Sequence, residues 1–183
     1  MSAENYGQLV VALLGAALVA ASWGWSRLGT LIWTPAALAL LAAAAAVAAV
    51  PAEVTLDGRG GRAALATVAG ALAVVGGGPV TARVFALVDR GETAAQSMDR
   101  AGQVLRGGAW IGALERAAIF ASLVGGWPEG LAVVLALKGL GRYPELRAAE
   151  DGVRTGASER FIIGTFTSVL WAAACAGVVV LVV

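Results

Sequence analysis

Long apolar runs constrain this chain more than any other feature of its sequence. A helix needs about 20 consecutive, mainly apolar residues to cross about 30 Å of hydrocarbon, and the sequence offers several such stretches. Of its 183 residues, 59% are hydrophobic and 14% are charged, whereas an average soluble domain carries about 25% charged residues. The sequence therefore predicts an all-α fold, a polytopic transmembrane helical bundle that forms one domain over residues 1–183.

Six spans are predicted, at about 8–25, 31–50, 63–82, 108–124, 129–143 and 160–182. The fifth apolar run is short for a full crossing, so a membrane-embedded hairpin of the fourth and fifth runs is the alternative. Ser158 is suited to cap the N-terminus of the last span. Segment 83–106 is too polar to span, and its apolar residues recur at roughly helical spacing. It fits either a cytoplasmic interfacial helix or a solvated connector.

Basic residues are distributed unevenly between the predicted loops. One side of the membrane would carry ten of them: Arg27, Arg83, Arg90, Arg100, Arg106, Lys138, Arg142, Arg147, Arg154 and Arg160. The other side would carry only Arg59 and Arg62, and Arg116 lies within a span. The positive-inside rule puts the basic side in the cytoplasm, so an even number of spans leaves both termini outside. Because Arg, Ala and Gly are abundant, we expect a multi-pass protein of a bacterial inner membrane.

Composition also disfavours several classes of function. The net charge is +1 and aromatic residues do not alternate with basic clusters, so no nucleic-acid partner is expected. Histidine is absent and Cys175 is the single cysteine, so we expect no zinc, haem or other cofactor, although a carboxylate-only Mg²⁺ or Ca²⁺ site stays open. Cys175 lies among small residues and is expected to be buried. Without histidine a general base would have to be Asp or Glu, and we expect no enzyme.

An acid and a base lie side by side in the apolar run G-A-W-I-G-A-L-E-R-A-A-I-F. Adjacent helical residues point about 100° apart, so Glu115 and Arg116 do not pair with one another. Arg116 has the longer reach and is expected to extend to the cytoplasmic headgroups. Glu115 must find a partner inside the bundle. Helical rise places Glu115 about 12 Å and Lys138 about 8 Å from the cytoplasmic surface, so Lys138 is the first candidate, before Arg142 and Arg160.

A second unusual feature of the third span is the sequence G-G-G-P at 76–79. Three glycines weaken the helix and the proline removes a backbone donor. A break here would start a new helix at Pro79 and point its positive end into the cytoplasmic half of the membrane. Transporters hold anions at such half-helix ends, so Gly77 and Gly78 become candidate binding residues.

Together these features predict a polar cluster on the cytoplasmic side. Besides the 76–79 break, it comprises Glu115, Arg116, Lys138, Arg142, Glu159 and Arg160. Four of its side chains are cationic, which suits an anionic guest such as a lipid phosphate. The alternative is purely structural, with Glu159 favouring its helix N-terminus, arginines anchoring the span ends and a Glu–Lys pair fixing helix packing.

Three motifs follow one another in the C-terminal half: G-A-W-I-G-A-L-E-R, A-L-K-G-L-G-R and S-E-R-F-I-I-G-T. From about residue 76 the chain resembles an uncharacterised bacterial membrane-protein family, a domain of unknown function, with the patterns G-x-x-I-G-x-L-E-R, A-x-K-x-x-x-R and I-G-T. The first two spans carry none of the family's N-terminal features. The resemblance implies no activity, but it implies one motif set containing Glu115, Arg116, Lys138, Arg142 and Glu159.

Three functions follow from these patterns. The first is a non-catalytic subunit or accessory partner of a larger cell-envelope or transport assembly, or a homo-oligomer. Small-residue faces would let other helices approach closely, as at Gly70 with Ala66 and at Gly164 with Ser168. The alternative is a small carrier or lipid-handling protein with an anion or phospholipid-headgroup site in the cytoplasmic leaflet. The third is an enzyme acting on lipid headgroups, which D-G-R-G-G-R at 57–62 suggests only superficially.

Overall fold

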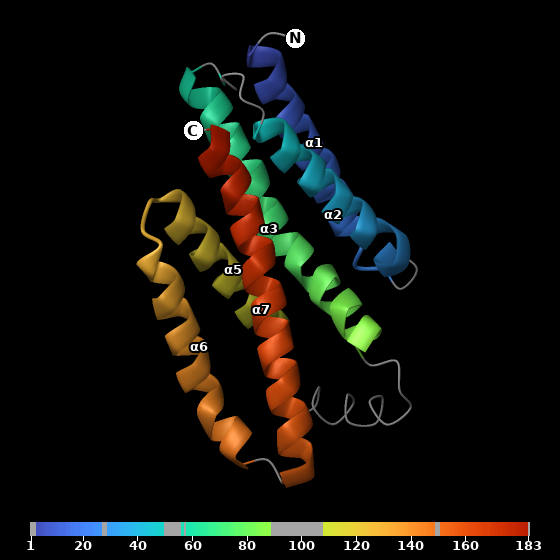
Figure 1. Cartoon of the computed structure of the whole chain (residues 1–183), viewed down its shortest axis with the longest axis vertical. Helices are drawn as coiled ribbons and strands as arrows, with labels where there is room; N and C mark the ends of the chain where they lie inside the picture. Colours follow the sequence, from blue (N-terminus) through green and yellow to red (C-terminus); the bar gives the residue numbers. More distant parts are fainter. Residues whose placement is uncertain are drawn as a thin grey trace.

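The computed structural model describes residues 3–26, 29–49, 56, 58–88, 108–148 and 151–182, without the side chains of 3, 145, 146, 148 and 151–157. Regular structure in this part of the chain is entirely helical (Figure 1). The helices are α1 (Ala3–Trp23), α2 (Gly29–Ala48), α3 (Gly58–Val88), α5 (Gly108–Val124), α6 (Glu129–Ala148) and α7 (Asp151–Val182). Four of them, α1, α2, α3 and the Ser158–Val182 part of α7, are long and apolar enough to cross a membrane. The predicted all-α membrane fold is confirmed.

The two longest helices, α3 and α7, pack together at the centre of the bundle, with the α1–α2 hairpin on one side and the α5–α6 hairpin on the other (Figure 1). Buried residues recur every three or four positions on each central helix, for example Leu65, Ala69 and Leu72 on α3. Small side chains on the facing stripes, such as Ala172 and the fully buried Cys175 on α7, let the helices approach closely. Cys175 is therefore a packing residue, as predicted.

The α5–α6 hairpin bears on the predicted number of spans. Its turn lies between the two ends of the bundle, below the end at which α1 begins and α7 ends (Figure 1). Helix α5 has only 17 residues, and α6 carries Lys138, Arg142 and Arg147. This arrangement favours the partly inserted hairpin over two further full crossings. Four and six crossings are both even, so the orientation argument is the same for either.

Helix boundaries correct three of the predictions. Helix α3 continues through 76–79, so the predicted break at Pro79 is wrong. Helix α7 begins at Asp151, which places Ser158 inside the helix rather than at its N-cap. Residues 83–88 extend α3, and the remainder of the predicted interfacial segment, 89–106, lies outside the described residues. Both long helices therefore continue beyond the apolar stretch from which their spans were predicted.

A hydrogen bond from outside the helix explains why α3 tolerates its proline. Pro79 has no N–H to donate to the carbonyl of Val75, four residues earlier. The indole Nε1 of Trp25, in the turn after α1, donates to that carbonyl at 3.2 Å. A carbonyl left without a partner in lipid would cost several kcal/mol, so Trp25 supplies what the proline removes.

This compensation predicts a measurable coupling between the two residues. Replacing Trp25→Phe leaves the Val75 carbonyl without its donor and should lower the free energy of unfolding by about 1–3 kcal/mol. In the double variant Trp25→Phe with Pro79→Ala, the new backbone N–H can bond Val75, so much of the loss should be recovered. Denaturing-detergent titration of the wild type, both single variants and the double variant gives the coupling energy. Strict additivity would contradict the explanation.

The three consecutive glycines at 76–78 of α3 have three different neighbours. A Cβ atom at Gly76 would overlap the indole of Trp171 on α7, and one at Gly77 would overlap the side chain of Arg116 on α5. A Cβ atom at Gly78 would lie 2.7 Å from the ring of Trp25. The glycines thus let α3 be approached from three directions.

Candidate functional site

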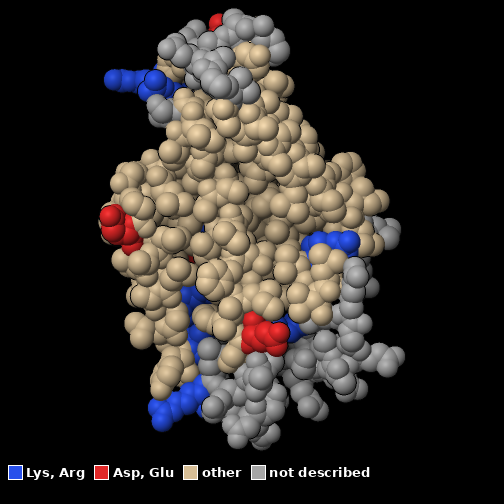
Figure 2. All heavy atoms as spheres, in the orientation of Figure 1, with Lys and Arg blue, Asp and Glu red and all other residues tan. Residues whose placement is uncertain are grey.

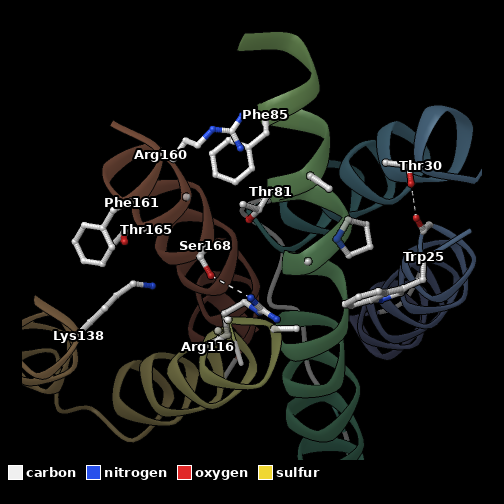
Figure 3. A pocket seen from close by; sticks show the side chains of 18 of the residues that line it. Trp25, Thr30, Thr81, Phe85, Arg116, Lys138, Arg160, Phe161, Thr165 and Ser168 are labelled. Carbon is white, nitrogen blue, oxygen red and sulfur yellow. Dashed lines mark hydrogen bonds between the residues drawn. The ribbon is translucent and has the colours of Figure 1, made fainter. Parts of the chain in front are cut away.

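An open pocket of about 430 Å³ lies where α3, α5, α6, α7 and the α1–α2 turn meet (Figure 3). Aromatic side chains form part of its wall, with Trp25 on one side and Phe85 and Phe161 on the other. Gly78 and Pro79 of the G-G-G-P sequence also line it. Part of the predicted cluster therefore lines this pocket, and a continuous α3 replaces the predicted half-helix end.

Four cationic side chains line this pocket: Arg116, Lys138, Arg142 and Arg160. No Asp or Glu from the described part of the chain lines it. Helical rise and topology predicted that the same four side chains would lie together. Among the described lining residues, every charged side chain is therefore cationic.

Arg116 is buried, with 5% of its surface exposed, so the prediction that it extends to the headgroups is wrong. Its Nε and Nη2 atoms donate to the Val74 carbonyl at 3.1 and 2.8 Å, and its Nη1 donates to Oγ of Ser168 at 3.2 Å (Figure 3). Gly77 leaves the space that the side chain occupies. Because these acceptors are neutral, they orient the guanidinium without cancelling its charge.

Glu115 forms an ion pair with Lys138, as predicted. The two side chains are 12% and 16% exposed, respectively. Glu115 does not line the cationic pocket but a second, mainly apolar hollow of about 400 Å³ between α5 and α6. Lys138 and Arg142 line both hollows. The Lys138 side chain therefore stands between the carboxylate and the cationic pocket.

The remaining predicted residues divide into two groups. Arg160 lines the pocket and its guanidinium lies 5.0 Å from the ring centre of Phe85 on α3 (Figure 3). Glu159 is exposed and is not part of the pocket lining. Gly77 is buried behind Arg116 rather than lining the pocket. Of the predicted residues, the pocket lining thus includes the four cations and Gly78 but not Glu115, Glu159 or Gly77.

The hydroxyl groups of the pocket were not predicted as site residues, among them two on α7. Ser168 binds Arg116, and Thr165 has a buried Oγ1 atom without a hydrogen-bond partner among the described residues. Both lie on the pocket face of α7 with Phe161 (Figure 3). Their spacing, at positions 161, 165 and 168, is the i, i+4, i+7 pattern of one helix face. That pattern was the available signal.

Metal binding has no support in the described residues, which contain no group of three or more His, Cys, Asp or Glu side chains suited to hold an ion. Comparisons with known protein families, curated proteins and solved structures give no match. The family resemblance therefore stays a prediction. Functional inference rests on the chemistry of the pocket itself.

Proposed function

We propose that this protein binds an anionic group in the cytoplasmic half of the membrane and acts as a small carrier or lipid-handling protein. The guest is either an inorganic anion or the phosphate of a lipid headgroup. One observation carries the proposal: the pocket lined by four cationic side chains and by no described carboxylate. Guanidinium and ammonium groups are the usual protein partners of phosphate and related oxyanions.

The energetics of the pocket support an anionic guest. Charged groups in membrane-spanning regions are costly unless they are paired or reach water. Glu115 balances Lys138, but the hydrogen-bond acceptors of Arg116 are a backbone carbonyl and a hydroxyl, which carry no charge. An anion would supply a negative charge inside the pocket, which no described carboxylate lines. It would also offer an acceptor to the Thr165 hydroxyl, which has no partner among the described residues.

The distribution of charged residues supports placing the site in the cytoplasmic half of the membrane. On the face seen in Figure 2, most of the described Lys and Arg atoms lie in the lower half of the molecule, away from the end at which α1 begins. Under the positive-inside rule that half faces the cytoplasm. We infer that the protein lies in a bacterial inner membrane with both termini outside and the pocket open toward the cytoplasmic leaflet.

The competing proposal, a docking subunit of a larger assembly, has less support. That prediction was based on helix faces made of small residues, but these faces pack against other helices of the same chain. A Cβ atom at Gly70 would lie 3.1 Å from the ring of Phe120, and one at Gly164 would lie 3.0 Å from that of Phe85. Ser168 is engaged by Arg116. We therefore place the anion-binding function first, and we keep it non-catalytic because no described carboxylate lines the pocket.

Loss of one pocket cation should weaken anion binding. Arg160→Gln is expected to lower the affinity for sulfate about tenfold, because a charge-assisted hydrogen bond contributes about 1.5 kcal/mol or more and about 1.4 kcal/mol corresponds to tenfold. Arg147→Gln is the matched control, because Arg147 is exposed, contacts Tyr143 and does not line the pocket. Isothermal titration of the purified protein in zwitterionic nanodiscs measures both.

A second arm separates the two kinds of guest. The same variants are placed in nanodiscs with and without phosphatidylglycerol, and lipid retained by the protein is quantified by mass spectrometry. Enrichment of phosphatidylglycerol without sulfate binding identifies a headgroup site, and the reverse identifies a site for a free anion. If the wild type binds neither probe, or if Arg160→Gln and Arg147→Gln bind both probes equally, the pocket is not the site.

A further inference from the structure

Lys138 is shared between two negative partners, one present and one proposed. Its ammonium group pairs with Glu115 at the hollow between α5 and α6. The same side chain lines the cationic pocket and lies 5.8 Å from the ring centre of Phe161 on α7. Figure 3 shows Lys138 extending from α6 toward the space that Arg116, Thr165 and Phe161 surround. The ammonium can therefore face either the carboxylate or a guest in the pocket.

We propose that anion binding is coupled to the uptake of one proton by Glu115. A bound anion takes the Lys138 ammonium from the carboxylate, and Glu115 then accepts a proton from solvent on its freed oxygen. This mechanism rests on the proposed anion-binding function and assigns the protein to proton-coupled anion carriers or binders. No covalent bond other than the new O–H bond of the carboxyl group is formed.

The physical reason for the coupling is the cost of leaving an unbalanced charge in a poorly hydrated site. Glu115 is 12% exposed, so an unpaired carboxylate there would pay a large desolvation cost without its ammonium partner. Protonation removes that charge. For a monovalent anion, the guest and the proton enter together and the net charge of the site is unchanged. An anion that draws Lys138 away without a proton would instead leave the Glu115 carboxylate without the ammonium that now balances it.

The surroundings of Glu115 identify the other groups involved. From α6, Lys138 and Arg142 share its hollow. From α7, Arg160 lines the cationic pocket, and the described lining of either pocket includes no titratable group from α3. On its own helix, Arg116 is directed to Val74 and Ser168. Arg142 is therefore the other described cation that lines the hollow of Glu115.

Affinity and proton uptake test the coupling in the wild-type protein. Sulfate is the probe because it stays fully ionised between about pH 5 and pH 8, so any pH dependence belongs to the protein. Lower pH favours the protonated carboxyl group and frees Lys138, so the affinity should rise as pH falls, by up to about tenfold per unit for one linked proton. A pH-sensitive dye in weak buffer should report about one proton taken up per sulfate bound.

Two variants assign the proton to its site. Glu115→Gln keeps a hydrogen-bond acceptor for Lys138 but cannot titrate, so its sulfate affinity should be as high as that of the wild type at low pH and independent of pH. Arg142→Gln should bind more weakly but keep the proton uptake. If wild-type binding is independent of pH, or if the pH dependence persists in Glu115→Gln, the coupling is wrong while the binding function stands. If the wild type binds neither sulfate nor phosphatidylglycerol, the proposed function itself fails. Sulfate binding that does not depend on pH overturns the coupling alone.

Discussion

Gly76→Ala should destabilise the folded protein by about 1–3 kcal/mol, although the same exchange stabilises an ordinary helix by about 0.5–1 kcal/mol. The added methyl group would overlap the indole of Trp171, which is 3% exposed and donates from Nε1 to the Leu72 carbonyl at 3.1 Å. The ring cannot bend away and is enclosed by the core. Either α7 moves away from α3 or the indole loses its hydrogen bond.

A matched control separates this clash from the general effect of removing a glycine. Gly15 lies in the middle of α1, and a Cβ atom there would meet nothing within 4 Å. Gly15→Ala should therefore leave the free energy of unfolding unchanged or raise it. Denaturing-detergent titration in the same micelles measures both variants. Equal effects of the two exchanges would show that α3 and α7 are not as closely packed as the geometry requires.

Lys138→Met should destabilise the protein by about 3 kcal/mol or more, because it leaves the Glu115 carboxylate unpaired in a poorly hydrated position. The double variant Lys138→Met with Glu115→Gln removes both charges and should recover most of that loss. The expected loss is the cost of leaving one charge unpaired, not the net contribution of the pair to stability. Replacing both partners of a buried ion pair is often nearly neutral.

Unfolding in nanodiscs of native lipid composition is the appropriate measurement for this cycle. Arg147→Met serves as the control, because it removes a cation from the exposed end of the same helix and should change stability by less than about 1 kcal/mol. If Lys138→Met is no more harmful than Arg147→Met, the ion pair contributes little to the fold. A double variant no more stable than Lys138→Met would show that Glu115 was not the group left unpaired.

Membrane helices and the Glu115–Lys138 pair were predictable because both depend on regular geometry. Apolar length defines a span, and a constant rise per residue brings two side chains on antiparallel helices to similar depth. The same reasoning predicted that the cations of the pocket would lie close together. None of this required knowledge of which way a side chain turns within its helix.

Two predictions failed because they treated one helix without its neighbours. By propensity alone, G-G-G-P should break a membrane helix, but Trp25 replaces the donor that Pro79 lacks, and other side chains fill the space above the glycines. By length alone, Arg116 should reach the headgroups, but Val74 and Ser168 offer acceptors nearby. Tertiary contacts overrode local preference in both cases, and they are not readable from one sequence.

The order in which the chain is synthesised gives the hydrogen bonds to α3 a further consequence. Trp25 precedes α3, so the donor for the Val75 carbonyl is already present when this helix leaves the ribosome. The donors to Val74 and Leu72 come from Arg116 and Trp171, which are made later. During biogenesis α3 can therefore enter the bilayer with its proline site already satisfied, and it acquires its final position only when α7 arrives. Insertion of α7 thus completes the packing around the glycines at 76–78.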